Sequence, residues 1–94
     1  MRNYELVFIV HPELEETAFQ EIVQKVQSWI TDGGGEVTQL DIWGKQKLKY
    51  PIKRQQEGQY VLVKAQMPPA LCSDLERNLR LTEQVLRFLL IVKD

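Results

Sequence analysis

The sequence has little of the chemistry from which most active sites are built. It holds one cysteine, Cys72, and one histidine, His11, among 94 residues. A single cysteine excludes an internal disulfide and a zinc site with several cysteine ligands. His11 has no second histidine or cysteine for metal ligation, and the sequence places no nucleophile beside it, so we interpret it as a turn residue. We therefore predict no catalytic residue, no metal and no cofactor.

Long apolar segments are also missing. No run is long enough to cross a bilayer, and residues 1–5 lack the apolar stretch and cleavage site of a signal peptide. We expect no membrane association and a cytoplasmic location, with which a lone cysteine is consistent. Repeats and low-complexity segments are absent from the sequence as well. We interpret the chain as a single domain over residues 1–94.

The formal net charge is small, at −1, but the charges are segregated along the chain. Residues 1–44 carry eight acids and two cations, and residues 65–94 carry four of each. Between them, residues 45–64 carry six cations and one acid. A basic segment within an otherwise acidic chain indicates a localised surface for an anionic partner.

Alternating lysines dominate this basic segment. In an extended strand Leu48, Tyr50 and Ile52 would share one face, and the other face would carry Lys45, Lys47, Lys49 and Lys53. Lysines often protect an edge strand from pairing, but that role explains one or two of them and not the whole row. We predict polyanion binding by this row and the adjacent Arg54. Further candidates for the same surface are Arg2, Arg80 and Arg87.

The hydrophobic periodicity predicts alternating strands and helices. The expected elements are strands at 3–10, 36–53, 59–67 and 85–92, helices at 14–31 and 69–81, and a loop at 54–58. Gly44 predicts a bulge or kink within the long second strand, and Pro51 predicts that this strand lies at an edge. This order is the split βαβ arrangement, βαββαβ. We predict an α+β, ferredoxin-like fold, with a four-stranded antiparallel sheet and both helices on one face.

The second face of such a sheet has no helix to cover it. We expect it to present Val7, Ile9, Tyr60, Leu62, Leu89 and Ile91, and an apolar patch of this kind usually marks a protein partner. A bulge that turns some of these residues inward, or a loop that covers them, is the alternative. Base stacking on the sheet would need aromatic residues on the central strands, where only Tyr60 is available. The pattern favours a protein on the sheet and phosphate contacts from the lysines.

The segment from Gly44 to Lys53 resembles the signature of the bacterial ribosomal protein S6 family, of the small subunit. Similarity extends over essentially the whole chain, including Met1 to Glu5, His11-Pro12, Gly58, Met67-Pro68, Leu79-Arg80 and the segment from Arg87 to Lys93. Two positions depart from the family. Gln46 stands where a cation is usual, and Lys49 stands where a small residue is usual.

The resemblance implies a structural, non-catalytic component of the small (30S) ribosomal subunit, with the same fold. It also implies binding to 16S ribosomal RNA together with ribosomal protein S18, and no small-molecule substrate. Carried over by position, the RNA contacts would be Lys45, Lys47, Lys53 and Arg54, with Arg2, Arg80 and Arg87 as further candidates. The protein contacts would be Val7, Ile9, Tyr60, Leu62, Leu89 and Ile91.

Two other functions use the same fold. An acylphosphatase-like enzyme would need an arginine in a phosphate-cradling loop after the first strand, whereas residues 11–16 are acidic there. A small-molecule-binding regulatory domain would dimerise through its sheet edges. A stable homodimer that ignores RNA would favour this second alternative.

Overall fold

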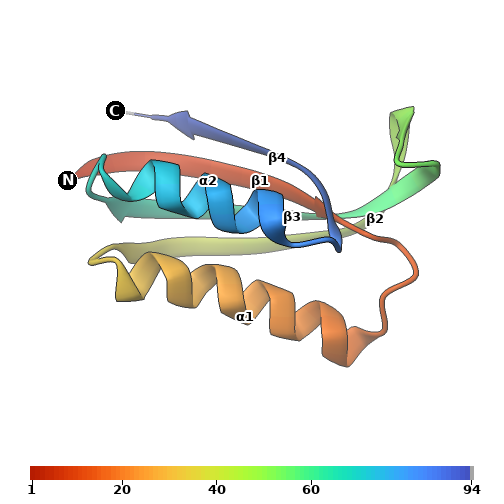
Figure 1. The fold of residues 1–94 in the computed structure, drawn as a ribbon, viewed down its shortest axis with the longest axis horizontal. Coiled ribbons are helices and arrows are strands. Elements are labelled where there is room, and N and C mark those ends of the chain that lie inside the picture. The colour runs from red at the N-terminus through yellow and green to blue at the C-terminus, as the bar shows by residue number, and fades with distance from the viewer. Residues whose placement is uncertain (94) are drawn as a thin grey trace.

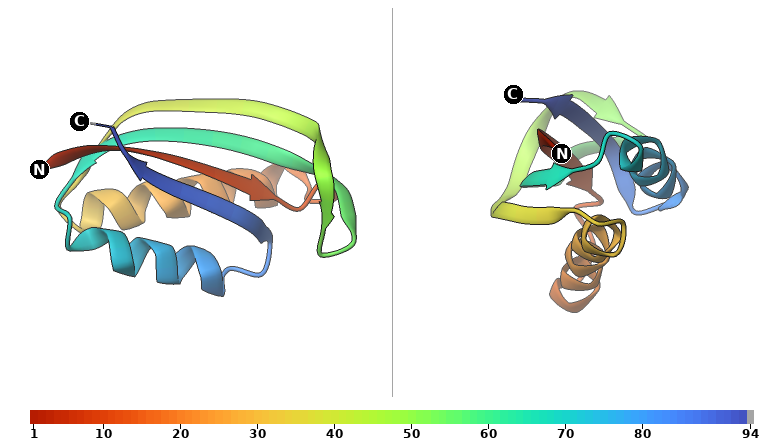
Figure 2. Two further views of the ribbon diagram at one scale, coloured as in Figure 1. Left: turned by 90° about the horizontal axis from the view of Figure 1, so that it is seen from above. Right: turned by 90° about the vertical axis from the view of Figure 1, so that its left-hand side faces the viewer.

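Four strands and two helices follow one another in the order β1 (Arg2–Val10), α1 (Glu16–Asp32), β2 (Glu36–Ile52), β3 (Gln55–Met67), α2 (Leu71–Leu81) and β4 (Val85–Val92). The structure is a computed structural model that describes residues 1–93. The strands form one antiparallel sheet in the order β2-β3-β1-β4. Both helices lie on the same face of the sheet (Figures 1 and 2). The predicted ferredoxin-like fold is therefore confirmed.

The core lies between the sheet and the helices. In β1, Leu6, Phe8 and Val10 face the helices and are buried, and in β3 Val61 and Val63 do the same, as strict alternation along a strand requires. The helices contribute residues spaced three or four apart, namely Phe19, Ile22, Val23, Val26 and Ile30 from α1 and Leu75 and Leu79 from α2. Each large apolar side chain buried in this way contributes about 1.5–3 kcal/mol.

Glycines end α1 one residue beyond the predicted helix at 14–31. The amide of Gly33 donates to the carbonyl of Trp29, and the amide of Gly35 donates to the carbonyl of Ile30. Gly34 has a φ of +92°, a left-handed conformation that costs other residues free energy. The chain can therefore reverse at once into β2.

A tight hairpin replaces the predicted loop at 54–58. β2 extends to Ile52 and β3 begins at Gln55, so only Lys53 and Arg54 form the turn. Both have positive φ, of 48° and 69°. Two-residue turns of this kind match the twist of antiparallel strands, and they usually carry asparagine and glycine. The prediction was wrong because neither residue is a usual signal for such a turn.

The edge strand β2 contains two irregularities. One lies between Ile42 and Gly44, where the register shifts and Gly44 has a φ of +82°. It confirms the predicted kink, and the place of β2 at the sheet edge confirms the prediction from Pro51. The second lies between Lys47 and Ile52, where residues 48–51 oppose Gln56 alone. We call the end of the β2–β3 pair, residues 45–58, the hairpin. It rises on the side of the sheet away from the helices (Figure 1).

Candidate nucleic-acid and protein interfaces

The hairpin lysines do not form the single row that the sequence predicts. Lys45 lies opposite Gln59 and Lys47 lies opposite Glu57. Alternation along β3 puts Glu57 and Gln59 on the same face as Val61, which faces the helices, so both lysines belong to the helix side of the sheet. Lys49 falls within the irregular segment of β2 and lines a pocket on the other side. Regular alternation ends at this irregularity, which is why the prediction was wrong for Lys49.

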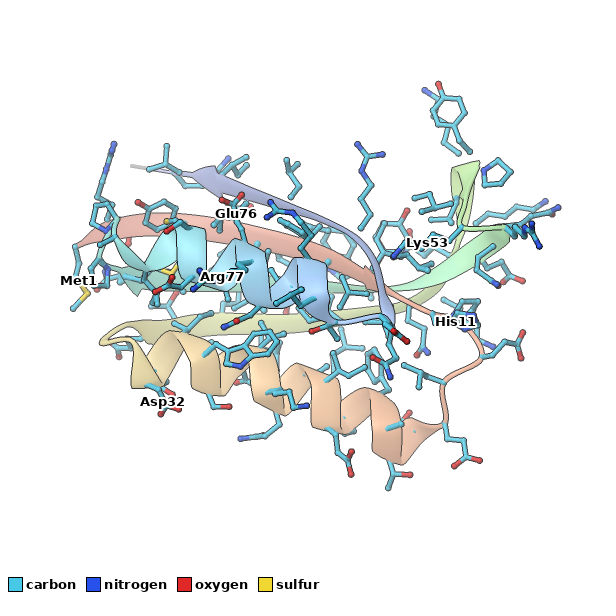
Figure 3. All side chains as sticks on the ribbon, viewed as in Figure 1. Met1, His11, Asp32, Lys53, Glu76 and Arg77 are labelled. Carbon is cyan, nitrogen blue, oxygen red and sulfur yellow. The ribbon has the colours of Figure 1, made fainter. Side chains whose placement is uncertain are left out.

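The positive charges of the hairpin face solvent. The side chains of Lys45, Lys47, Lys49, Lys53 and Arg54 are all exposed. Among residues 1–93, no carboxylate lies within ion-pairing distance of any of them, although Glu57 is the register partner of Lys47. Exposed charges without a partner keep their long-range field. The hairpin is thus a compact basic protrusion, with Lys53 at one end of the molecule (Figure 3).

The other three candidate arginines are dispersed. Arg2 pairs with Met67 at the end of the sheet opposite the hairpin, and the neighbouring Met1 marks that end in Figure 3. Arg80 projects from α2 with its guanidinium 5.8 Å from the ring centre of Phe88. Arg87 lies opposite Ile9 on the sheet face away from the helices. The structure therefore brings only Arg87 close to the hairpin on that face.

The six predicted partner-binding residues share the sheet face that the helices leave open, which we call the apolar face. Val7 of β1 lies between Leu62 and Leu89, and Ile9 lies between Tyr60 and Arg87. Two residues before Val7 on the same strand, and further from the hairpin, Glu5 lies between Lys64 and Ile91. Exposure is uneven, because Leu89 is 59% exposed whereas Leu62 is 9% and Ile9 7% exposed. The accessible part of this face is therefore its β4 side.

Ile9 is buried because the hairpin folds over it. Gly58 of β3 lies so close that a Cβ atom there would be 2.2 Å from Ile9 Cγ2 and 3.6 Å from Leu48 Cδ2. Only glycine allows this approach. The hairpin therefore covers one end of the apolar face, which agrees with the alternative that a loop hides part of it.

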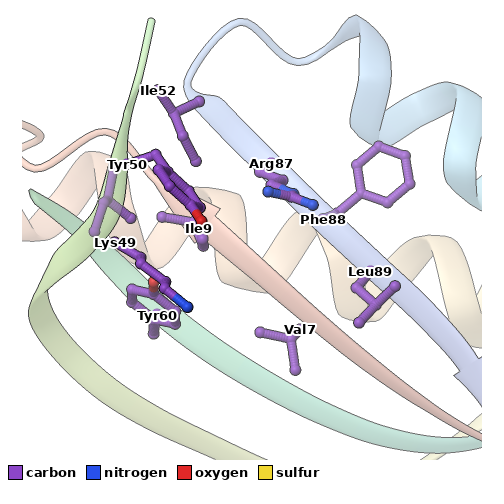
Figure 4. Close-up of a pocket in the computed structure, with 10 residues that line it drawn as sticks. Val7, Ile9, Lys49, Tyr50, Ile52, Tyr60, Arg87, Phe88 and Leu89 are labelled. Atoms are coloured by element: carbon purple, nitrogen blue, oxygen red, sulfur yellow. The ribbon is translucent and has the colours of Figure 1, made fainter. Parts of the chain in front are cut away.

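A pocket of about 360 Å³ lies between the hairpin and the apolar face (Figure 4). Its apolar lining includes Val7, Ile9, Leu48, Ile52 and Leu89. Its polar groups come from Lys49, Tyr50, Tyr60 and Arg87. The sequence did not predict this pocket, because its lining comes from all four strands and these residues meet only when the hairpin folds over the sheet.

Trp43 is a second surface feature that the sequence did not assign to a site. Its ring stacks on that of Tyr60, with centroids 6.3 Å apart and planes inclined by 17°. It is nevertheless 47% exposed. The bulge at Gly44 places Trp43 beside Tyr60, and an aromatic residue directly before a kink glycine was the available signal.

The remaining candidates for chemistry have structural surroundings. His11 lies in the turn after β1, where its Nδ1 accepts a hydrogen bond from the amide of Glu13. Within the described residues, no group of three histidine, cysteine or acidic side chains could hold a metal ion. Cys72 is half-buried in the first turn of α2. None of the described helices is long and apolar enough to cross a membrane.

Comparison with known proteins identifies close relatives over nearly the whole chain. The family model described as ribosomal protein S6 matches residues 3–92. Small ribosomal subunit protein bS6 of Moorella thermoacetica is 44% identical over 90 residues, covering 96% of this chain and 92% of the relative. The protein of the same name from Clostridium kluyveri is 44% identical over 94 residues, covering 100% and 98%.

A solved structure also matches this fold closely. The crystal structure of 30S ribosomal protein S6 from Thermotoga maritima superimposes with a TM-score of 0.94 at 26% sequence identity. The match covers 98% of this chain and 87% of the Thermotoga chain. The two chains therefore share one architecture although most of their residues differ.

Proposed function

The chain belongs to the ribosomal protein S6 family, and from this premise we propose that it is a structural, non-enzymatic constituent of the small ribosomal subunit in the cytoplasm. The observation that carries this proposal is the family match over residues 3–92, together with relatives at about 44% identity that are named small ribosomal subunit protein bS6. We further propose that the protein binds 16S ribosomal RNA together with ribosomal protein S18.

The hairpin supports the RNA-binding part of this proposal. Lys45, Lys47, Lys53 and Arg54 are exposed and lie within ten residues of sequence on one protrusion. Lysine and arginine contacts to phosphates supply affinity and orientation, and they need no base-specific geometry. We propose these four as the main RNA contacts. Arg2 and Arg80, which lie elsewhere on the molecule, are proposed as peripheral ones. Arg87, the third candidate predicted from the sequence, lies on the apolar face, and we propose it for the protein partner instead.

The apolar face supports the protein-binding part. Val7, Ile9, Tyr60, Leu62, Leu89 and Ile91 occupy one side of the three strands β3, β1 and β4. Leu89 and Ile91 remain exposed on it, and exposed apolar groups clustered in this way usually mark a protein interface. We propose this face as the site for S18, with its centre on the β4 side.

The two surfaces together predict cooperative assembly. Four phosphate contacts by this chain alone give weak binding at physiological salt. A partner docked on the apolar face would add its own cations beside the hairpin without the entropic cost of a separate encounter with the RNA. We therefore expect S18 to raise the RNA affinity of this protein at least tenfold.

A quantitative binding assay with fragments of 16S ribosomal RNA tests the proposal. The RNA is titrated with this protein, with S18, and with their equimolar mixture. The proposal requires a complex between the two proteins and tighter RNA binding by the mixture than by either protein. Absence of a protein complex, or RNA affinity that S18 leaves unchanged, would contradict it.

Neither alternative function finds comparable support. The connection between β1 and α1, residues 11–15, holds Glu13 and Glu15 and no arginine, which does not suit phosphate cradling. A regulatory domain that dimerises through its edges would form a homodimer. Analytical ultracentrifugation of the protein without RNA shows whether such a homodimer forms.

A further inference from the structure

We propose that the pocket between the hairpin and the apolar face binds an anchor of the protein partner, formed by a large apolar side chain with a carboxylate beside it. The inference rests on the proposed function, in which a protein docks on the apolar face, and it specifies the chemistry of that contact. Interfaces of this kind depend on a few side chains that enter well-formed pockets. The pocket supplies such a concave place at the hairpin end of this face.

The aliphatic side chains that form the floor of the pocket indicate the apolar part of the anchor. Val7 and Ile9 of β1, Leu48 and Ile52 of the hairpin and Leu89 of β4 supply aliphatic surface on several sides. The volume of about 360 Å³ lies at the small end of the range for ligand pockets and suits one large side chain with part of its backbone. Burial of such a side chain removes apolar surface from water on both partners.

The two cations that line the pocket indicate the charged part of the anchor. Lys49 from β2 and Arg87 from β4 both line the pocket, and no carboxylate does. Among residues 1–93, neither cation forms an ion pair, and the one ring contact of Lys49 is with Tyr50, 5.9 Å from its Nζ atom. Figure 4 shows Lys49 and Arg87 on either side of Ile9. Two unpaired cations around an apolar floor complement an acidic group, and guanidinium binds carboxylate through two parallel hydrogen bonds.

A nucleobase fits the same pocket less well. The polar edges of a base need both donors and acceptors when they are buried. The lining side chains offer donors from Lys49 and Arg87, but acceptors only from the hydroxyls of Tyr50 and Tyr60. Among the tyrosines of the lining, Tyr60 already stacks on Trp43, and the ring of the exposed Tyr50 has Lys49 Nζ 5.9 Å from its centre. The lining therefore favours a peptide segment over RNA.

Charge-removing variants test the inference. Isothermal titration calorimetry measures the affinity of the full chain for S18, with Lys49→Gln, Arg87→Gln and the control Lys25→Gln. Lys25 is an exposed lysine of α1, on the other side of the sheet. We expect about a tenfold loss of affinity for each pocket variant and no change for the control. Equal effects of all three variants would indicate general electrostatics and overturn the inference.

Charge reversal identifies the acidic group directly. Arg87→Glu is combined with single Asp→Arg or Glu→Arg variants of S18, and one of these should restore at least half of the lost binding free energy. If no reversal restores binding, the pocket holds no carboxylate of this partner. If the pocket variants weaken RNA binding and leave S18 binding intact, the pocket belongs to the RNA site. If wild-type protein fails to bind S18, the proposed function itself fails, which is a separate outcome.

Discussion

Gly58 is the residue on which closure of the hairpin depends most directly. Its Cα lies against Ile9, whose Cγ2 methyl is bonded directly to Cβ and moves only by rotation about χ1, which is restricted in a β-branched side chain. Gly58 is also buried, so an added methyl group has no route to solvent. Close packing is therefore the reason for a glycine at position 58. Backbone conformation is not the reason, because the φ of Gly58 lies outside the left-handed range that Gly34 and Gly44 adopt.

Gly58→Ala should therefore destabilise the protein by about 2–3 kcal/mol, because the new Cβ overpacks the contact with Ile9. Urea denaturation followed by circular dichroism measures the change. Gly44→Ala is the control, since its Cβ would meet no atom within 4 Å and only its φ of +82° is strained, at a cost of about 1 kcal/mol. In an Ile9→Ala background, Gly58→Ala should cost less than about 1 kcal/mol. An equal cost in both backgrounds would show that Ile9 is not the obstacle.

Leu62 and Leu89 both belong to the apolar face, but they differ in exposure and therefore in their value as mutational probes of it. Leu62 is only 9% exposed, so a charge there would disturb the fold as well as an interface. Leu89 is 59% exposed and can carry a charge in the free protein. The sequence alone does not distinguish them, because alternation assigns both to one face.

Leu89→Glu should abolish measurable binding to S18 and change the free energy of unfolding by less than about 0.5 kcal/mol. A pull-down and a urea titration measure the two effects. Leu81→Glu is a matched control, because Leu81 is 74% exposed at the end of α2, on the helix side of the sheet. Persistent binding of the Leu89 variant would remove β4 from the partner site.

At the scale of elements, the hairpin turn combines strain with charge. Lys53 and Arg54 both adopt left-handed conformations, which cost non-glycine residues about 1–2 kcal/mol each. Asparagine and glycine are the usual residues of such a turn. Strained residues that a sequence retains are often functional, and here both carry the positive charge proposed to contact RNA.

Replacing the turn by Lys53→Asn and Arg54→Gly should stabilise the protein by about 1 kcal/mol, because both new residues tolerate positive φ. The same double variant should bind RNA more weakly. Lys53→Gln and Arg54→Gln form the matched control, which removes the charges and keeps the strain, so RNA affinity falls and stability stays unchanged. Urea denaturation and RNA titration measure both quantities. A stability loss in the Asn-Gly variant would contradict the turn geometry.

At the scale of the whole molecule, charge and apolar surface are separated. The hairpin carries unpaired cations at one end, whereas acidic residues predominate in α1 and the chain before it. The apolar face lies next to the hairpin, so a protein bound there and an RNA bound at the hairpin would also contact each other. This adjacency is the physical reason for which we propose cooperative assembly.

Lys45→Ala combined with Lys47→Ala should lower the slope of log affinity against log salt by roughly two, because each lysine is proposed to neutralise one phosphate. RNA titrations between low and physiological salt, in the presence of S18, give the slope. Lys25→Ala on α1 serves as the control and should leave the slope unchanged. An identical slope for the double variant would exclude these two lysines from the RNA interface.

The sequence by itself determined the element order, the faces of β1, β3 and β4, the end of α1 and the position of β2 at the sheet edge. These follow from local rules, because alternation, helical spacing and the backbone freedom of glycine act over a few residues. The concentration of cations between residues 45 and 64 was equally visible in the sequence.

Only the tertiary structure decided where the hairpin points. Its irregular segment, residues 48–51, breaks the alternation that assigned Lys49 to the same face as Lys45 and Lys47. The approach of Gly58 to Ile9 closes one end of the apolar face and brings Lys49 and Arg87, 38 positions apart in the sequence, to one pocket. Contacts of this kind depend on twist and packing between distant segments, which local patterns do not specify.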